Sequence, residues 1–363
     1  MVMLSELLKG TQLLKDNQGR VVVQTIQNMS LAFLTCPPEY SLDDKFADPT
    51  RSVKVSNRAY GNLRVENVAE RDILVAPQIV VMNDYASQNH AMTKSGIVRR
   101  KSAVEYNDAG CIQGSQGGHI NAGREDKIRF MPVGMREMAL DVSAKRGEFS
   151  RLYPAVDAFG VRVGIRADHY LDRYFTKYDP QTSEFIAHFE RPARCIGVVV
   201  MIDGEIVAID KFPSFTYAAQ VWDLLIRDCY GSLAIESQVN GATGRKRFTE
   251  KVVAASTGFS PVAHLLAILD SVEQDISNDA TDRLAEVMTV QFGTRPDPDA
   301  GGEYASNILE SDGYVGQVIS SGEYHHLVSL VKRARFDPQA LRKAYEVTSQ
   351  YRELAQSQRV FSL

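Results

Sequence analysis

The sequence contains only four cysteines among its 363 residues, and no two of them form a Cys-x-x-Cys pair. Cys36, Cys111, Cys195 and Cys229 are widely separated, which argues against a zinc site or a disulfide framework and predicts reduced, mostly buried thiols. No run of 18 apolar residues occurs, and the opening segment MVMLSELLKGTQLLKD is too polar for a signal peptide or a membrane span. We therefore expect a cytoplasmic protein that does not enter a membrane.

An excess of basic residues is also missing, because the formal net charge is -4. General nucleic-acid binding requires a basic face, so this charge argues against it. The run Gly244-Arg245-Lys246-Arg247 is the one local exception and is more typical of a solvated loop. Hydrophobic residues make up 44% and charged residues 24%, the usual mixture of a globular protein with a substantial core.

Extended, β-branched runs dominate the first part of the chain. They fall at residues 20–26, 31–34, 72–75, 78–82 and 127–131. The strongest local signal is Asp203-Gly204 between two apolar runs, 196–202 and 205–209, because both positions of a tight hairpin turn favour left-handed backbone. A helix with Ser214 at its N-cap should follow this hairpin.

Helix-start signals occur at Ser260-Pro261 and Asp337-Pro338, so the last third is predicted to be mainly helical. Asp168, His169 and Asp172 lie in another predicted helix, where a solvated face explains them. The predicted class is α+β, with an antiparallel β-rich body and helices concentrated in the C-terminal third. We expect a β-rich domain over residues 1–250 and a helical region over 251–363 packed on it.

Two polar segments could carry a site. The first follows the predicted strand 78–82, and the second is the Gly-rich stretch CIQGSQGGHI at 111–120. Amide side chains suit sugar hydroxyls and base edges, and glycines allow close backbone approach to an anion. The candidate ligand-binding residues are Asn83, Asp84, Gln88, Asn89, Gln113, Gly114, Gly117, Gly118 and His119. The alternative is a set of polar loops that bond to each other.

His90 and Cys111 are the candidate catalytic residues. Histidine is suited to proton transfer near neutral pH, and Cys111 could act as a nucleophile with His90 or His119 as its base. A lone cysteine beside β-structure is more commonly a small buried hydrophobe. No metal site is predicted, and the sequence leaves any cofactor unknown. The stretch 114–118 is neither a P-loop nor a dinucleotide fingerprint, and no Gly-x-Ser-x-Gly elbow is present.

Two stretches resemble the domain family named for its association with ADP-ribosylglycohydrolases and the rhodanese/phosphatase superfamily. Gln88-Asn89-His90 and Cys111-Ile112-Gln113 are similar to its Gln-Asn-Arg and Cys-Val-Glu motifs. The second stretch is Gly197 to Val200, Asp203-Gly204, Asp210-Lys211-Phe212 and the helix of Trp222. The resemblance spans about residues 10 to 240. It implies a context of ADP-ribose and nucleotide metabolism, without a defined reaction.

Departures from that family pattern bear on catalysis. His90 stands where the family tends to have arginine, Gln113 where it has glutamate, and Gly117-Gly118-His119-Ile120 where an Arg-Trp pair is expected. If the glutamate is an acid/base group, this chain lacks it, so the sequence leaves open whether it is an enzyme. The favoured hypothesis is a protein that binds an ADP-ribose-like or other nucleotide-derived ligand, and the sequence leaves open whether it also processes that ligand. The alternative is a self-assembling homo-oligomeric scaffold, motivated by extended runs such as 20–26.

Overall fold

The computed structural model describes residues 1–43, 45–57, 61–82, 89–114, 127–144, 152–239, 262–297 and 302–333. These residues belong to two units: Met1–Asp48 with Thr182–Lys332 forms unit 1, and Pro49–Gln181 with Arg333–Leu363 forms unit 2. Antiparallel sheets combine with helices, several of them in the C-terminal half, so the α+β class is confirmed. The expected boundary at residue 250 falls outside the described residues and stays a prediction.

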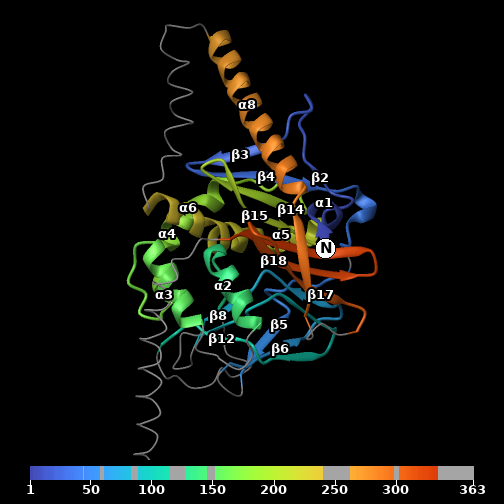
Figure 1. The fold of residues 1–363 in the computed structure, drawn as a ribbon, viewed down its shortest axis with the longest axis vertical. Helices are drawn as coiled ribbons and strands as arrows, with labels where there is room; N and C mark the ends of the chain where they lie inside the picture. Colours follow the sequence, from blue (N-terminus) through green and yellow to red (C-terminus); the bar gives the residue numbers. More distant parts are fainter. Residues whose placement is uncertain are drawn as a thin grey trace, which may run out of the picture. The chain divides into compact units, whose positions relative to one another are not determined.

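A ten-stranded antiparallel sheet forms the centre of unit 1 (Figure 1). Its order is β1-β16-β17-β18-β19-β15-β14-β4-β2, and β3 also pairs with β4. The strands are β1 (Val2–Met3), β2 (Gln12–Leu13), β3 (Val23–Ile26), β4 (Met29–Thr35), β14 (Gly197–Ile202), β15 (Glu205–Lys211), β16 (Gln291–Pro296), β17 (Ala305–Glu310), β18 (Tyr314–Ser321) and β19 (Tyr324–Lys332). Early, middle and late segments of the chain therefore share one sheet.

Four of these strands, β16 to β19, occupy residues 291–332, where the sequence analysis predicts mainly helix. Instead of forming helices, the apolar runs of β18 and β19 pair with each other, and β19 also pairs with β15. The helix expected after Pro261 is present as α8 (Val262–Met288), while the one expected after Pro338 lies outside the described residues. None of the described helices is long and apolar enough to cross a bilayer.

The hairpin of β14 and β15 confirms the turn prediction. Asp203 and Gly204 both have left-handed backbone, with φ of 52° and 82°, as the tight turn requires. Ser214 caps helix α5 (Phe215–Leu224), because its side chain accepts a hydrogen bond from Tyr217 N at 3.0 Å. The π-helix η3 (Leu225–Tyr230) and helix α6 (Gly231–Val239) continue from α5. Short helices α1 (Leu4–Leu7) and η1 (Pro38–Tyr40) complete unit 1.

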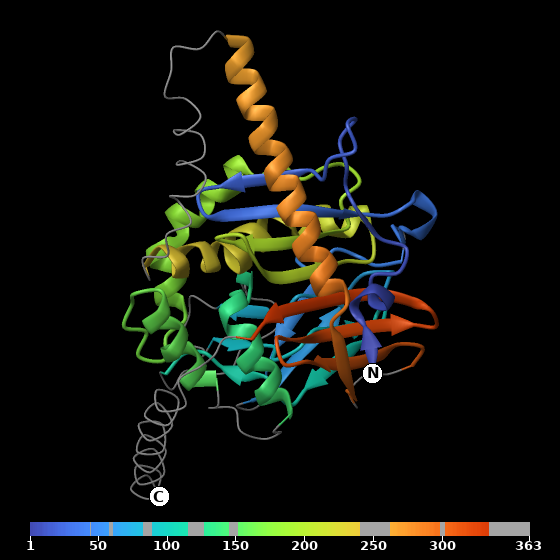
Figure 2. The same cartoon turned by 45° about the horizontal axis from the view of Figure 1, so that its top comes forward.

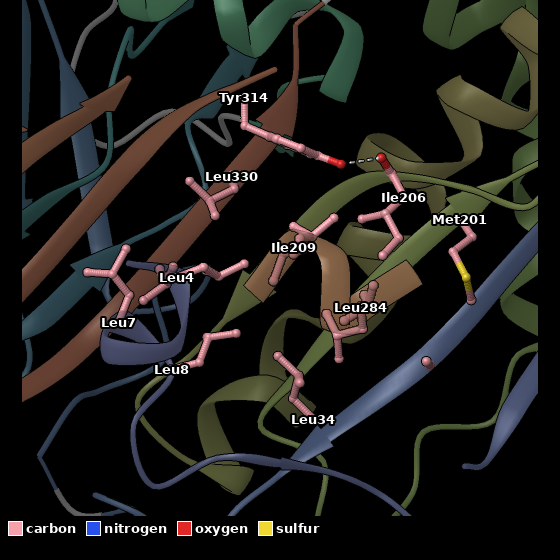
Figure 3. Packing of buried hydrophobic residues seen from close by; sticks show 14 of the residues in the cluster. Leu4, Leu7, Leu8, Leu34, Met201, Ile206, Ile209, Leu284, Tyr314 and Leu330 are labelled. Atoms are coloured by element: carbon pink, nitrogen blue, oxygen red, sulfur yellow. Dashed lines mark hydrogen bonds between the residues drawn. The ribbon is translucent and has the colours of Figure 1, made fainter. Parts of the chain in front are cut away.

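Helices α8 and α5 cover opposite faces of the sheet. Successive side chains along each strand point to opposite faces and therefore contact one helix or the other. Leu34 of β4 and Met201 of β14 share a buried cluster with Leu284 of α8, the orange helix that crosses the strands in Figure 2. Phe33 points to the other face and meets Trp222 of α5 at a ring distance of 6.2 Å. Figure 3 shows the α8 side of this core. Each buried leucine-sized side chain there contributes about 1.5–3 kcal/mol.

Unit 2 contains three smaller antiparallel sheets, with orders β10-β7, β11-β6-β5 and β12-β9-β8-β13. Their strands are β5 (Val53–Ser56), β6 (Leu63–Asn67), β7 (Ile73–Val75), β8 (Ile79–Met82), β9 (His90–Ala91), β10 (Gly96–Val98), β11 (Ala103–Tyr106), β12 (Gly110–Cys111) and β13 (Lys127–Phe130). Helices α2 (Val133–Ala144) and α3 (Leu152–Arg162) follow, and α4 (Asp172–His188) leads into unit 1.

Helix α3 packs tightly against β12. A Cβ atom at Gly110 would collide with the Leu152 side chain, so only glycine allows this approach. The close packing brings the first turns of α3 beside the segment that begins with Cys111, and this segment carries half of the predicted site.

Candidate functional site

The two segments predicted to carry the site lie side by side in unit 2. Strands β9 and β12 pair with His90 opposite Cys111. Beyond the strands, Ile112 N donates to Asn89 O at 3.1 Å, and Asn89 N donates to the side-chain Oε1 of Gln113 at 3.0 Å. Asn89, His90, Cys111 and Gln113, separated by about twenty residues in the sequence, therefore form one connected group.

Six other predicted site residues lie outside the described residues: Asn83, Asp84, Gln88, Gly117, Gly118 and His119. The basic run 244–247 also lies outside them. Their proposed roles stay predictions, and the site described below is built from the remaining residues alone.

His90 is completely buried and has two polar neighbours at its Nε2 atom. Asn57 Nδ2 lies 3.3 Å from this nitrogen, and Cys111 Sγ lies 3.5 Å from it. An amide nitrogen only donates, so Nε2 acts as the acceptor in the contact with Asn57. The arrangement places the His90 ring between a thiol and an amide.

Cys111 is equally buried, and burial raises the pKa of its thiol to about 12, although hydrogen bonds from the Gly61 backbone and the Tyr153 side chain act in the opposite direction. At neutral pH the group is therefore a thiol and not the nucleophilic thiolate. All four cysteines are free and buried, which confirms that part of the sequence analysis.

We expect Cys111 to resist alkylation in the native protein. At pH 8 a thiol with a pKa of about 12 is about 0.01% thiolate, so iodoacetamide should leave Cys111 unmodified over hours. The same reagent should modify all four cysteines in urea, which is the control. Intact-mass spectrometry measures both reactions. A rapid single adduct on native Cys111 would show that the thiol is activated.

A partly exposed polar surface adjoins this buried group. The Tyr153 hydroxyl of α3 donates to Gln113 O at 3.1 Å, and the Tyr153 ring stacks on the His169 ring with centroids 5.0 Å apart. Gly114 lies against the same histidine, because a Cβ at position 114 would be 3.1 Å from His169 Cβ. Gln113, Gly114, Tyr153 and His169 thus form one continuous surface.

Asp157 fixes the orientation of His169. One carboxylate oxygen accepts from His169 N at 2.7 Å, and the other lies 2.6 Å from ring Nδ1. The helix predicted for residues 168–172 is wrong over its first part: Asp168 and His169 lie in a turn with φ of 49° and 67°, and α4 begins only at Asp172. Gly164, with φ of 66°, ends the preceding helix and is the sequence signal that the prediction missed.

The chain was compared with known proteins. Residues 21–286 match the family model ARPP-1, the ARG and Rhodanese-Phosphatase-superfamily-associated Protein domain. The chain belongs to the ARPP-1 family. No curated protein and no solved structure matches it. The matched region includes both stretches on which the resemblance was based, and it continues past residue 240 into α8.

The second stretch that resembles the ARPP-1 family, which includes residues 210–212, lies in unit 1. Its side chains are packed or hydrogen-bonded within that unit. Asp210 is fully buried and accepts a hydrogen bond from the Tyr230 hydroxyl at 2.5 Å. Burial lowers the pKa of the neighbouring Lys211 to about 8, and its ammonium group donates to the carbonyl of His325. Phe212 stacks on Tyr217. Asp210, through Tyr230, and Phe212, through Tyr217, therefore stabilise the junction of the sheet with η3 and α5.

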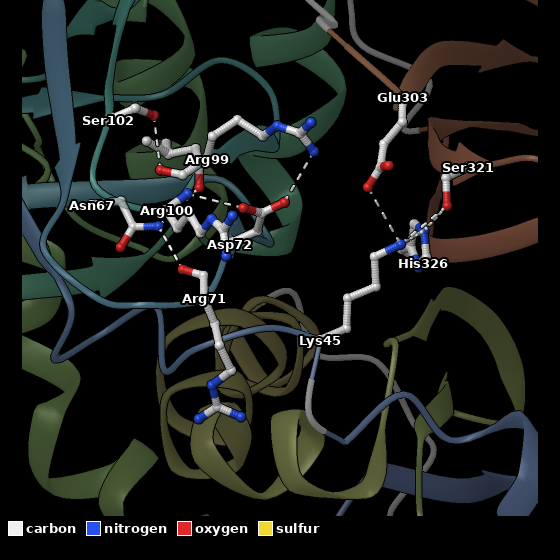
Figure 4. Close-up of polar contacts among 11 residues, drawn as sticks. Lys45, Asn67, Arg71, Asp72, Arg99, Arg100, Ser102, Glu303, Ser321 and His326 are labelled. Atoms are coloured by element: carbon white, nitrogen blue, oxygen red, sulfur yellow. Dashed lines mark hydrogen bonds and ion pairs between the residues drawn. The ribbon is translucent and has the colours of Figure 1, made fainter.

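A further polar cluster in unit 1 surrounds His326 of β19 (Figure 4). Its Nε2 atom lies 2.6 Å from Ser321 Oγ and 3.5 Å from Lys45 Nζ, which also lies 3.8 Å from Glu303. Across the described ranges, no three His, Cys, Asp or Glu side chains form a group that could hold a metal ion.

Proposed function

We propose that this ARPP-1 protein binds an ADP-ribose-like or other nucleotide-derived small molecule at a site that we call the amide–imidazole surface. It consists of Gln113, Gly114, Tyr153 and His169, with Asn89 buried directly behind Gln113. The observation that carries the proposal is the hydrogen bond between Asn89 N and Gln113 Oε1, because it joins the two motif segments into one polar group.

The chemistry of this surface fits a sugar–phosphate ligand. Amide and phenol groups both donate and accept, as recognition of hydroxyls and base edges requires. Gly114 allows the backbone to approach a ligand closely. Gln113, Tyr153 and His169 are partly exposed, whereas Asn89, His90 and Cys111 are buried behind them. The buried residues support the surface that a ligand would touch.

The proposal concerns ligand binding and does not assign a reaction. A catalytic role for His90 or Cys111 stays a prediction, and the burial of both groups, together with the raised pKa of Cys111, favours a supporting role. The ARPP-1 family is associated with ARG and the rhodanese-phosphatase superfamily, and ADP-ribose is the ligand class that this association suggests.

Isothermal titration calorimetry with ADP-ribose, NAD and AMP tests the proposal. We expect ADP-ribose to give a measurable binding heat, and we expect Gln113→Ala to weaken the affinity by about tenfold or more, the effect of losing one well-placed polar contact. Gln113→Glu keeps an acceptor for Asn89 N and should retain the local fold. Gln274→Ala, on an exposed glutamine of α8, is the matched control and should bind as wild type does.

Absence of heat and of any thermal shift with all three ligands would contradict the proposal, since a ligand that binds the native state must raise its stability. A sharp high-order oligomer in sedimentation, unchanged in Gln113→Ala and without a ligand response, would support the scaffold alternative instead.

A further inference from the structure

Lys211, the last residue of β15, differs from the buried Lys94 in the partner of its side-chain nitrogen. Lys94 Nζ lies 3.3 Å from a carboxylate oxygen of Asp108. Lys211 Nζ donates instead to the main-chain carbonyl of His325, and within the described ranges no carboxylate forms an ion pair with it. A carbonyl oxygen accepts an N–H bond but does not balance a full positive charge. Lys211 therefore has a hydrogen-bond partner without a counter-ion.

The neighbours of Lys211 do not supply a negative charge. Asp210, the preceding residue of the strand, points to the opposite face, where it accepts a hydrogen bond from the Tyr230 hydroxyl. Cys36 is close enough to Lys211 for an electrostatic interaction, but burial raises the pKa of its thiol, so this group is uncharged at neutral pH. These surroundings favour the neutral amine of Lys211 over its ammonium form.

The neutral amine is the reactive form of a lysine. Burial lowers the pKa of Lys211 from 10.5 to about 8, and Cys36 opposes only part of this shift. At pH 7.5 about one quarter of Lys211 is then free amine, against about 0.1% of a lysine with the ordinary pKa. Enzymes use desolvated lysines of this kind to form Schiff bases with carbonyl compounds. Lys211 is only partly buried, unlike Lys94, so part of its side chain is open to a small molecule.

We propose that Lys211 is a nucleophilic amine site that takes a small aldehyde or ketone and forms a Schiff base with it. The amine nitrogen attacks the carbonyl carbon, and the carbonyl oxygen takes the displaced electron pair. That oxygen then leaves as water with the two protons of the amine, so the step needs neither an oxidant nor a reductant. The site lies in unit 1, whereas the amide–imidazole surface lies in unit 2, and the inference does not depend on the function proposed above.

Reductive alkylation of the folded full-length protein with propanal and sodium cyanoborohydride tests this site. The hydride reagent traps the Schiff base as a stable secondary amine, and peptide mass spectrometry assigns each adduct to its residue, including any adduct on the α-amino group of Met1. At pH 7.5 we expect Lys211 to react about tenfold faster than Lys332 or more, because a larger fraction of it is free amine. Lys332 is the comparison because it is an exposed lysine of the same unit, paired with Glu205.

Two variants and a denatured sample complete the experiment. Lys211→Arg keeps the positive charge but lacks the amine, so it should lose the fast adduct, whereas Lys332→Arg should retain it. In urea the two lysines of the wild-type protein should react at similar rates, because the environment of Lys211 is lost.

Equal rates at Lys211 and Lys332 in the native protein would overturn the proposal, and so would a fast lysine adduct that persists in Lys211→Arg. Should Lys211→Arg fail to fold, the comparison of the two lysines within the wild-type protein still decides, because both rates come from one sample. No nucleotide enters this experiment, so its failure and the failure of ADP-ribose binding are separate results.

Discussion

Asp108→Asn should lower the free energy of unfolding of unit 2 by about 3–5 kcal/mol, the usual cost of breaking a buried ion pair by removing the charge of one member. Asp108 Oδ2 lies 3.3 Å from Lys94 Nζ, and each side chain is only 4% exposed. An asparagine in place of Asp108 cannot neutralise the ammonium group, which water does not reach.

The loss of stability should depend on the charge of the pair and on its burial. Lys94→Met combined with Asp108→Leu removes both charges and should recover most of the lost stability, because replacing a buried pair with apolar side chains is often neutral or better. Glu70→Gln disrupts the exposed Lys101–Glu70 pair, whose oxygen and nitrogen lie 2.9 Å apart, and should cost less than about 1 kcal/mol. Native-state hydrogen exchange of residues 89–113 measures unit 2 directly. Equal exchange in Asp108→Asn and Glu70→Gln would refute the expectation.

This ion pair also bears on the amide–imidazole surface. Lys94 follows β9 in the chain, and Asp108 lies two residues before the start of β12, so the pair ties together the segments that present Asn89 and Gln113. We therefore attribute part of the geometry of the site to a buried contact that does not itself face a ligand. Sequence reasoning did not identify it, because neither residue stands in a motif.

The local features of the fold were readable from the sequence, whereas the pairing of distant strands was not. The Asp203-Gly204 hairpin and the Ser214 cap depend on neighbouring residues, and both are present. Asp312-Gly313, between β17 and β18, is the same kind of turn signal and was missed, while the strands β16 to β19 themselves pair with β15 and with each other. Tertiary contacts of this kind override weak local preferences.

The candidate site shows the same division. Amide-rich motifs marked Asn89 and Gln113, and the structure brings these two residues into contact. Tyr153 and His169 carry no motif, and they reach the site only because α3 packs on β12 and the chain turns after Gly164. The sequence also did not reveal which candidate residues are buried. His90 and Cys111 are reactive residue types, but both are fully buried in the structure.

Acid should destabilise unit 1 through His326, by about 2–3 kcal/mol between pH 6.5 and pH 4. Burial lowers the pKa of His326 from 6.5 to about 3, and the nearby charges of Lys45 and Lys211 add to the shift. As the pH falls, His326 of the unfolded chain therefore becomes protonated near pH 6.5, whereas His326 of the folded protein becomes protonated only near pH 3. Stability contributed by the neutral ring is complete above pH 6.5 and is lost as the pH falls through this interval, at up to 1.4 kcal/mol per pH unit.

The packing around His326 explains why the ring stays neutral. Phe46 and Tyr304 meet it edge-on at ring-centroid distances of 5.3 and 5.6 Å. The Ser321 hydroxyl, drawn in Figure 4, lies 2.6 Å from Nε2 and can donate to it. A proton on Nε2 would displace that donor and face the ammonium group of Lys45. The surroundings are therefore complementary to the uncharged form alone.

His326→Gln should remove the acid-dependent part of the loss. The variant loses ring contacts at every pH, so the informative quantity is the change in unfolding free energy between pH 6.5 and pH 4, which should be smaller by about 2–3 kcal/mol than in wild type. The fluorescence of Trp222, the single tryptophan of the chain, reports urea unfolding of unit 1. His188→Gln removes an exposed histidine of the same unit and should leave the wild-type slope unchanged. Parallel pH profiles for His326→Gln and His188→Gln would mean that His326 is not the group that destabilises unit 1 in acid.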